Sequence, residues 1–266
     1  MNLLQALILG LVEGITEYLP VSSTGHLLIA QRLFGIPASV AANSYIVAIQ
    51  AGAIVAVLGT YRIRVAGMLA GLTGRNPAGL HLALCLVAAF LPAAVLGVLF
   101  DDRIEKYLFG VKPVIAAWVV GGVVILALSR WIAARREGQS LDQLHWRAAI
   151  LIGLLQCLAM WPGTSRSLVT ILGGLAVGLS LSAAVEFAFL LGVITLGAAT
   201  AYATVKSGND MISSFGWPSL LVGFAAAWVS AALAVKWMVA WLNRHGLTLF
   251  AWWRFAAAAL AAVFLL

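Results

Sequence analysis

Charged residues are scarce in this sequence, because Asp, Glu, Lys and Arg together make up 9% of its 266 residues. A soluble globular domain carries roughly 25%. Hydrophobic residues account for 63% of the chain, which is more than an aqueous fold could bury. Uncharged runs of about 20 residues, the length that crosses a hydrocarbon core, recur along the chain. This composition excludes a soluble domain and predicts an all-α polytopic membrane protein.

Cysteine is also rare. Cys85 and Cys157 lie in apolar segments and lack the spacing of a metal or redox pair, so we interpret them as small core residues. We expect no cleaved signal peptide, because the N-terminus has no basic start and carries Glu13 and Glu17 inside its first apolar stretch. The excess of basic residues lies mostly in short connections, as the positive-inside rule requires, so we expect no nucleic-acid partner.

Six segments are long and apolar enough to cross the bilayer. They cover residues 40–60, 79–100, 113–132, 182–204, 218–241 and 247–266. Arg254 interrupts the last segment, and we expect its side chain and that of Lys236 to snorkel toward the membrane surface. Two further apolar regions, 2–34 and 145–179, are each broken in the middle by a cluster of Pro, Gly, Ser and Thr.

The two broken regions resemble each other. The sequence "GLVEGITEYLPVSSTGHLL" from Gly10 matches "GLLQCLAMWPGTSRSLVT" from Gly153, and each is followed by one long span and two more. The charges of the connections predict that the first region either enters and leaves from the outer face or crosses the bilayer twice, and that the second begins and ends at the inner face. This arrangement is typical of an inverted-topology repeat, with re-entrant hairpins in repeats 1–134 and 145–266 of one membrane domain.

Irregular backbone at membrane depth is tolerated where protein or trapped water satisfies its polar groups, so such breaks usually mark binding sites. Ordinary spans kinked at proline are the alternative. The first region holds Glu13 and Glu17, four residues apart on one helix face. Two adjacent carboxylates in apolar surroundings require a cation, a shared proton or a buried base between them. We predict a site for Mg²⁺ or Ca²⁺ there; an interfacial segment with its acids in water is the alternative.

The stretch "PVSSTGH" follows. Pro20 ends the first half-helix, and Ser22, Ser23 or Thr24 can cap the next one. The free N–H groups and positive dipole end of a helix start suit phosphate. His26 falls on the same face as one or both serines, so the stretch holds the parts of an activated nucleophile with a general acid or base. A structural histidine is the alternative.

The second break, "WPGTSRS" from Trp161, has a Pro-Gly turn, capping hydroxyls at Thr164 and Ser165, and a new helix start. It adds Arg166, which lies far from other charges in an apolar region and must have a partner. The planar fork of arginine suits phosphate oxygens and can stabilise a transferring phosphoryl group. A salt bridge to Glu13 or Glu17 is the structural alternative, and the two roles are compatible.

These residues resemble a known family, the undecaprenyl-diphosphate phosphatases, also called bacitracin-resistance proteins. The resemblance covers nearly the whole chain and is most specific in "EGITEYLPVSSTGHL" from Glu13 and "PGTSRS" from Pro162. It implies a bacterial inner-membrane enzyme that hydrolyses undecaprenyl diphosphate to the monophosphate carrier of cell-wall synthesis. It also implies a divalent cation and an active site reached from the periplasmic side.

By position, the family's catalytic residues correspond to Glu13, Glu17, Ser22, Ser23, His26 and Arg166, of which Glu13 and Glu17 are the metal-linked pair. We predict substrate contacts from Thr24, Gly163, Thr164, Ser165 and Ser167. The chain departs from the family pattern at "SRSLVT", where Leu168 and Val169 replace the usual Gly-Ala, and before "VAIQAGA", where Ile46 replaces an acid. The resemblance therefore indicates the fold more directly than the substrate range.

We therefore predict a phosphatase acting on an isoprenoid lipid diphosphate, with Ser22, Ser23 or water as the attacking group and the lipid tail between spans. A polyprenyl-phosphate transporter or flippase is the main rival, because inverted repeats with broken helices are typical of alternating access. The Ser and His beside paired acids favour chemistry. A catalytically impaired homologue is a further alternative because of Leu168. The oligomeric state stays open, a homodimer included.

Overall fold

The computed structural model describes residues 1–37, 39–108, 110–135 and 137–266. In these ranges the chain is almost entirely helical and forms no strand beyond one isolated bridge between Gln139 and Leu179. Four helical stretches are long and apolar enough to cross a membrane: Val40–Thr60, Pro77–Phe100, Leu181–Leu242 and Thr248–Leu265. The expectation of an all-α, multi-pass membrane protein is confirmed at this level.

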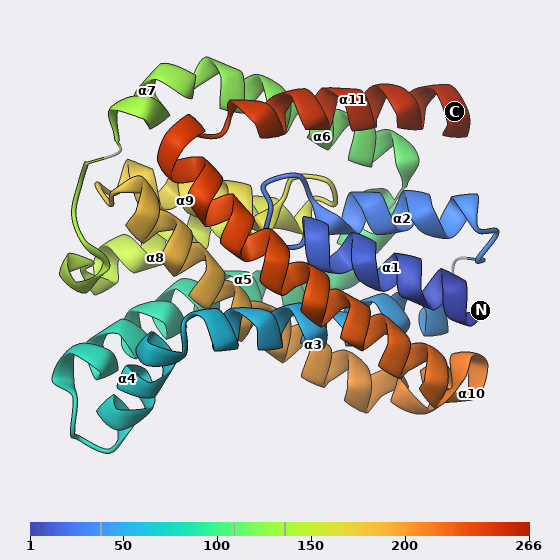
Figure 1. The fold of residues 1–266 in the computed structure, drawn as a ribbon, viewed down its shortest axis with the longest axis horizontal. Coiled ribbons are helices and arrows are strands. Elements are labelled where there is room, and N and C mark those ends of the chain that lie inside the picture. The colour runs from blue at the N-terminus through green and yellow to red at the C-terminus, as the bar shows by residue number, and fades with distance from the viewer. Residues whose placement is uncertain (38, 109, 136) are drawn as a thin grey trace.

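The first half of the chain contains α1 (Leu3–Thr16), α2 (Ser23–Leu33), α3 (Val40–Thr60), α4 (Arg62–Leu72), α5 (Pro77–Leu108), α6 (Val111–Ala127) and α7 (Ser129–Ala134). After the short 3₁₀ turn Leu141–Gln143, the second half contains α8 (Trp146–Gln156), the 3₁₀ turn Cys157–Met160, α9 (Arg166–Ala176), α10 (Leu181–His245) and α11 (Thr248–Leu265). Helix α1 packs against α3 and the long α10, and α2 lies beside α1 and α6 (Figure 1).

The predicted spans agree with the helices to different degrees. Helix α3 has the predicted bounds, whereas the predicted span 113–132 is divided between α6 and α7 at Leu128. The spans 182–204 and 218–241 both lie in α10, and the loop expected between them is helical up to a break at Gly216 (φ 72°, ψ 158°). The chain reverses direction at this glycine, so α10 has two arms (Figure 1).

The two predicted breaks are present, one between α1 and α2 and the other between the α8 region and α9. The spacing from the start of α1 to that of α2 equals the spacing from the start of α8 to that of α9, and α2 and α9 have 11 residues each. Ser22 and Ser165, directly before α2 and α9, both have positive φ. The two broken regions therefore repeat each other in register.

Glycines bring α1 close to the second arm of α10. A side chain at Gly10 would overlap the backbone of Gly223, and one at Gly14 would overlap the backbone of Ala227. Small residues spaced by four allow helices to approach closely in membrane proteins. Glu13 lies between these two glycines and is consequently fully buried.

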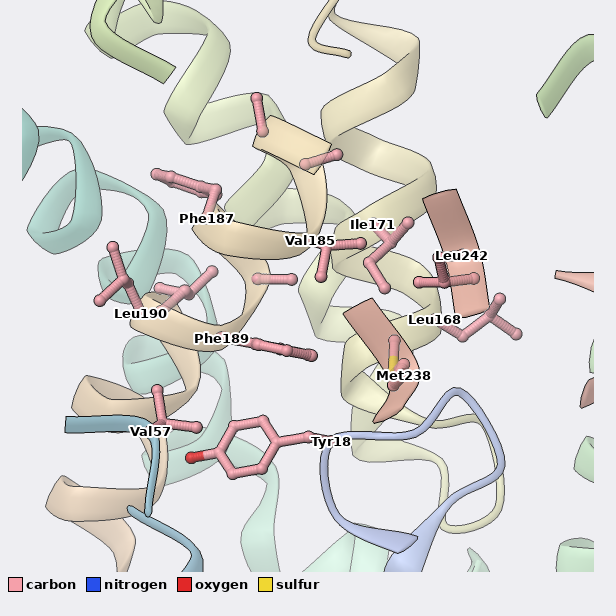
Figure 2. Close-up of a cluster of buried hydrophobic side chains, with 14 of the residues drawn as sticks. Tyr18, Val57, Leu168, Ile171, Val185, Phe187, Phe189, Leu190, Met238 and Leu242 are labelled. Atoms are coloured by element: carbon pink, nitrogen blue, oxygen red, sulfur yellow. The ribbon is translucent and has the colours of Figure 1, made fainter. Parts of the chain in front are cut away.

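The largest buried apolar cluster lies beside the first break. Tyr18 follows α1 and packs edge-on against Phe189 of α10, with ring centroids 5.0 Å apart. Leu168 of α9 belongs to the same cluster as Met238 and Leu242 from the second arm of α10 (Figure 2). This cluster fixes the positions of both breaks relative to α10.

Candidate active site

A cavity of about 260 Å³ lies where the two breaks meet. Most of the predicted site residues line it. Those from the first break are Glu17, Ser22, Ser23 and Thr24, and those from the second are Gly163, Ser165 and Arg166. Residues that are 149 positions apart in the chain, Glu17 and Arg166, are therefore neighbours.

Glu17 is the central charged group of this cavity. Its Oε2 accepts a hydrogen bond from the hydroxyl of Ser23, and its Oε1 lies 3.2 Å from Nη2 of Arg166. The salt bridge that the sequence offered as a structural alternative for Arg166 is thus present. A hydroxyl, a proton acceptor and a cation are joined in a buried chain, which is the arrangement of an activated nucleophile beside an anion-stabilising group.

Glu13 lies one helical turn before Glu17, and its backbone carbonyl accepts the N–H of Glu17. It is 0% exposed, and neither carboxylate oxygen has a hydrogen-bond partner among the described residues. An unpartnered buried carboxylate is costly, so a bound cation or proton would stabilise the Glu13 side chain.

The oxygens of Glu13 fit the donor set of a hard divalent cation. Among the described side chains, no group of three or more His, Cys, Asp or Glu could hold a metal ion. Mg²⁺ is commonly held by one or two carboxylates together with substrate phosphates and water. Glu13 itself does not line the cavity, and the two oxygens of Glu17 are engaged by Ser23 and Arg166. The cation site at Glu13 and Glu17 therefore stays a prediction.

Arg166 is the first residue of α9, and its side chain is held from several sides. Nη1 donates to the carbonyl of Ala188 at 3.0 Å, and Cζ lies 5.7 Å from the centre of the Tyr18 ring. A side chain at Gly192 would overlap the guanidinium, so this glycine makes room for it. These contacts direct the guanidinium toward Glu17 at the edge of the cavity.

The segment between α1 and α2 (residues 17–22) forms the first turn, and the segment before α9 (residues 161–165) forms the second. The two turns are joined by hydrogen bonds. The hydroxyl of Ser167 donates to the carbonyl of Leu19 at 2.9 Å, and the hydroxyl of Ser165 reaches the same oxygen at 3.5 Å. Ser165 also accepts a bond from the N–H of Leu168, as predicted for a capping residue, whereas the Ser22 side chain makes no capping bond. Ser167 is fully buried, and neither it nor Thr164 lines the cavity.

His26 does not lie in this cavity. Its Nδ1 is 2.7 Å from the carbonyl of Ser22, and its Nε2 accepts a bond of 3.0 Å from the indole N–H of Trp253. The ring lies between Trp118 and Trp253 and borders a separate apolar cavity of about 370 Å³. The imidazole thus lies outside the cavity that holds Ser23 and Glu17, and its predicted role as acid or base stays a prediction.

The expectation that Arg254 snorkels is wrong. Its side chain is 0% exposed, and its guanidinium donates to backbone carbonyls of both turns. Carbonyl acceptors leave no mark in a sequence, so hydropathy alone could not reveal these partners. Lys236, by contrast, is exposed.

Comparison with known proteins identifies the family of this chain. A model of the family described as bacitracin resistance protein BacA matches residues 6–260. The chain belongs to the BacA family. It is 43% identical to an undecaprenyl-diphosphatase of Sorangium cellulosum over 96% of this chain and 84% of that one. It is 44% identical to undecaprenyl-diphosphatase 2 of Rhodospirillum rubrum, over 96% of this chain and 92% of the relative.

The departure from the BacA pattern at Leu168 falls in the core. Leu168 is 2% exposed, packs in the cluster of Figure 2 and does not line the cavity. Ile46, the other departure, borders a neighbouring pocket that shares Thr24 and Gln50 with the cavity. The bulk of Leu168 therefore fills space between helices and leaves the cavity open.

Three polar residues that line the cavity of this BacA-family chain were missed from the sequence: Gln50 of α3, Gln156 of α8 and Thr195 of α10. Gln156 is 2% exposed, its Oε1 accepts from Thr195 at 3.4 Å, and its Nε2 has no partner among the described groups. In register, Gln156 occupies the place in its repeat that Glu13 has in the first. The matched sequences from Gly10 and Gly153 contained that signal.

Proposed function

We propose that this protein is a membrane phosphatase that hydrolyses undecaprenyl diphosphate to undecaprenyl phosphate and inorganic phosphate, and so recycles the lipid carrier of cell-wall synthesis. The names of its relatives support the substrate. The observation that carries the chemistry is the buried chain in which the Ser23 hydroxyl donates to Glu17 and Glu17 pairs with Arg166.

In this mechanism the oxygen of Ser23 attacks the terminal phosphorus, and Glu17 takes the hydroxyl proton. The bond from phosphorus to the oxygen of the leaving lipid monophosphate breaks as the bond to serine forms. Water then attacks the phosphoserine and releases inorganic phosphate, which restores the serine. Attack by water on the diphosphate itself is the competing route, and trapping of a phosphoserine distinguishes the two.

Charge on the transferring group is stabilised by Arg166 and by the N–H groups in the first turns of α2 and α9, where Ser23, Thr24 and Arg166 line the same cavity. Glu13 and Glu17 would hold a divalent cation together with phosphate oxygens. When bound, such a cation neutralises negative charge on the diphosphate. Thr24, Gly163 and Ser165 line the same cavity and would contact the phosphate groups.

We further propose six spans and two re-entrant hairpins in an inverted repeat, 1–134 and 145–266, with the cavity reached from the periplasmic side of the bacterial inner membrane. The equal spacing of the two broken regions supports the repeat. Single cysteines tested in a background without Cys85 and Cys157 would check the orientation. An impermeant maleimide should label Arg32→Cys from outside and Thr73→Cys only after the inner face is opened; the reverse pattern contradicts the topology.

Phosphate release by the purified protein tests the function. With undecaprenyl diphosphate and Mg²⁺ in detergent, the wild type should release phosphate, and Arg166→Ala should lose at least about 10²-fold in rate. Lys236→Gln, which removes an exposed cation, is the matched control. A wild type that moves polyprenyl phosphate across vesicles without releasing phosphate would favour the transporter, and an inactive wild type with both Mg²⁺ and Ca²⁺ would favour the impaired homologue.

A further inference from the structure

Arg254 lies in the middle of α11, yet its guanidinium reaches the two turns that border the cavity. Nη1 donates to the carbonyl of Pro20 at 2.9 Å, in the first turn. Nη2 donates to the carbonyls of Gly163 at 2.7 Å and Thr164 at 3.0 Å, in the second turn. One planar group therefore bonds to both turns at once.

The same guanidinium is also fixed to α6. Nε donates to the carbonyl of Trp118 at 3.3 Å, and Nη2 lies 3.1 Å from that of Ala117. A side chain at Gly121 of α6 would overlap the guanidinium, so this glycine leaves the space that the group fills. The position of Arg254 is thus determined by three separate segments.

All these acceptors are backbone carbonyls. Broken helices leave carbonyl oxygens without intrahelical partners, and such groups are costly at membrane depth. Arginine is suited to satisfy several of them because it has five N–H donors in a rigid plane. Burial of a cation is itself costly, so helix packing alone does not explain why an arginine is buried at this position.

The residue before Arg254, Trp253, is also linked to the first turn. Trp253 donates to Nε2 of His26, whose Nδ1 bonds to the carbonyl of Ser22. Ser22 has a left-handed backbone (φ 72°), a conformation that costs a serine energy and persists when its surroundings hold it. Two consecutive residues of α11 therefore fix the turn that leads directly into Ser23.

We propose that Arg254 is a positioning residue, which holds the two turns in register so that Ser23 and Arg166 act on the same phosphoryl group. This inference rests on the proposed phosphatase function. Arg254 does not line the cavity, so it acts through the turns and not on the substrate. Small misplacements of reacting groups cost about 10²-fold in rate. Correct placement of the two turns can therefore offset the cost of burying a charge. We call the set of bonds from Arg254 to both turns the clamp.

Two variants of the full-length protein test the clamp independently. Arg254→Lys keeps the charge but has a single nitrogen, which cannot reach both turns. Gly121→Ala keeps Arg254 and pushes its guanidinium out of place. For both we expect kcat for phosphate release from undecaprenyl diphosphate to fall about 10²-fold, with KM within about 3-fold of the wild type. Lys236→Gln is the control, with unchanged kcat.

A second readout follows the turns themselves, whether or not the protein releases phosphate. Hydrogen exchange should rise in peptides covering 18–24 and 161–167 in both variants and stay at the wild-type level in α3 and α5. If the wild type is active and both variants keep its kcat, the inference is overturned. It is also overturned if exchange rises along all of α11 and not in the two turns. An inactive wild type with the predicted exchange pattern would refute the proposed function and leave the clamp standing.

Discussion

Ser22 and Ser165 have the same left-handed backbone conformation, with φ of 72° and 76°, each at the residue before a helix whose first turn faces the cavity. A residue with a side chain pays roughly 1–3 kcal/mol for such a conformation. Ser165 uses its hydroxyl to cap α9, whereas Ser22 makes no capping bond. The shared backbone therefore aims the next residue of each turn, Ser23 in one and Arg166 in the other, into the cavity.

Ser22 and Ser23 are the two candidate nucleophiles, and substitutions at them should have different effects because only Ser23 donates to Glu17. Ser22→Gly should relieve the backbone and leave kcat within about 3-fold of the wild type, with the same or higher thermal stability. Ser23→Ala should lower kcat by at least about 10³-fold, because the attacking oxygen is removed. Phosphate-release assays and thermal unfolding in detergent measure both. An inactive Ser22→Gly beside an active Ser23→Ala would make Ser22 the nucleophile.

Glu13 should report on the cation. Chelation by EDTA should abolish phosphate release, and added Mg²⁺ should restore it. Glu13→Gln should need a higher Mg²⁺ concentration for half-maximal activity, because one carboxylate ligand is lost. Its unfolding temperature should not fall, because a buried amide costs less than an unpartnered carboxylate. An unchanged Mg²⁺ titration would remove Glu13 from the cation site.

The space beside Arg166 gives a steric test. Gly192→Ala should displace the guanidinium and lower kcat by about 10²-fold, since the fork would no longer face the phosphate. Gly197→Ala lies on the same helix, where an added methyl group would meet nothing within 4 Å, and should behave as the wild type. Equal activity of the two variants would mean that the position of Arg166 does not limit the reaction.

The role of His26 can be separated in the same way. Asparagine can place an amide N–H near the position of Nδ1 and so keep the bond to the Ser22 carbonyl. We therefore expect His26→Asn to retain most of the activity and the wild-type pH dependence of kcat, and His26→Ala to lose about 10-fold. A general acid or base at this position would instead cost about 10² to 10⁴-fold in both variants and remove a limb of the pH profile.

Some of this site could be predicted because a buried charge must have a partner. That rule marked Glu17 and Arg166 as intramembrane functional residues, and the Pro-Gly-Ser-Thr clusters gave both breaks. The partners of His26 and Arg254 could not be predicted, since one is an indole 227 residues away and the others are backbone carbonyls. The helix between 204 and Gly216 was also missed, because polar residues there resemble a loop although they remain helical.

The register of the two broken regions has a consequence for the history of the chain. Ser23 and Arg166 occupy the same place in their repeats, and so do Glu13 and Gln156. If the halves descend from one duplicated ancestor, they have divided its labour: the first now carries the acids and the hydroxyl, the second the cation and the amide. A pair of first halves would then lack a counterpart of Arg166, and a pair of second halves would lack counterparts of Glu17 and Ser23.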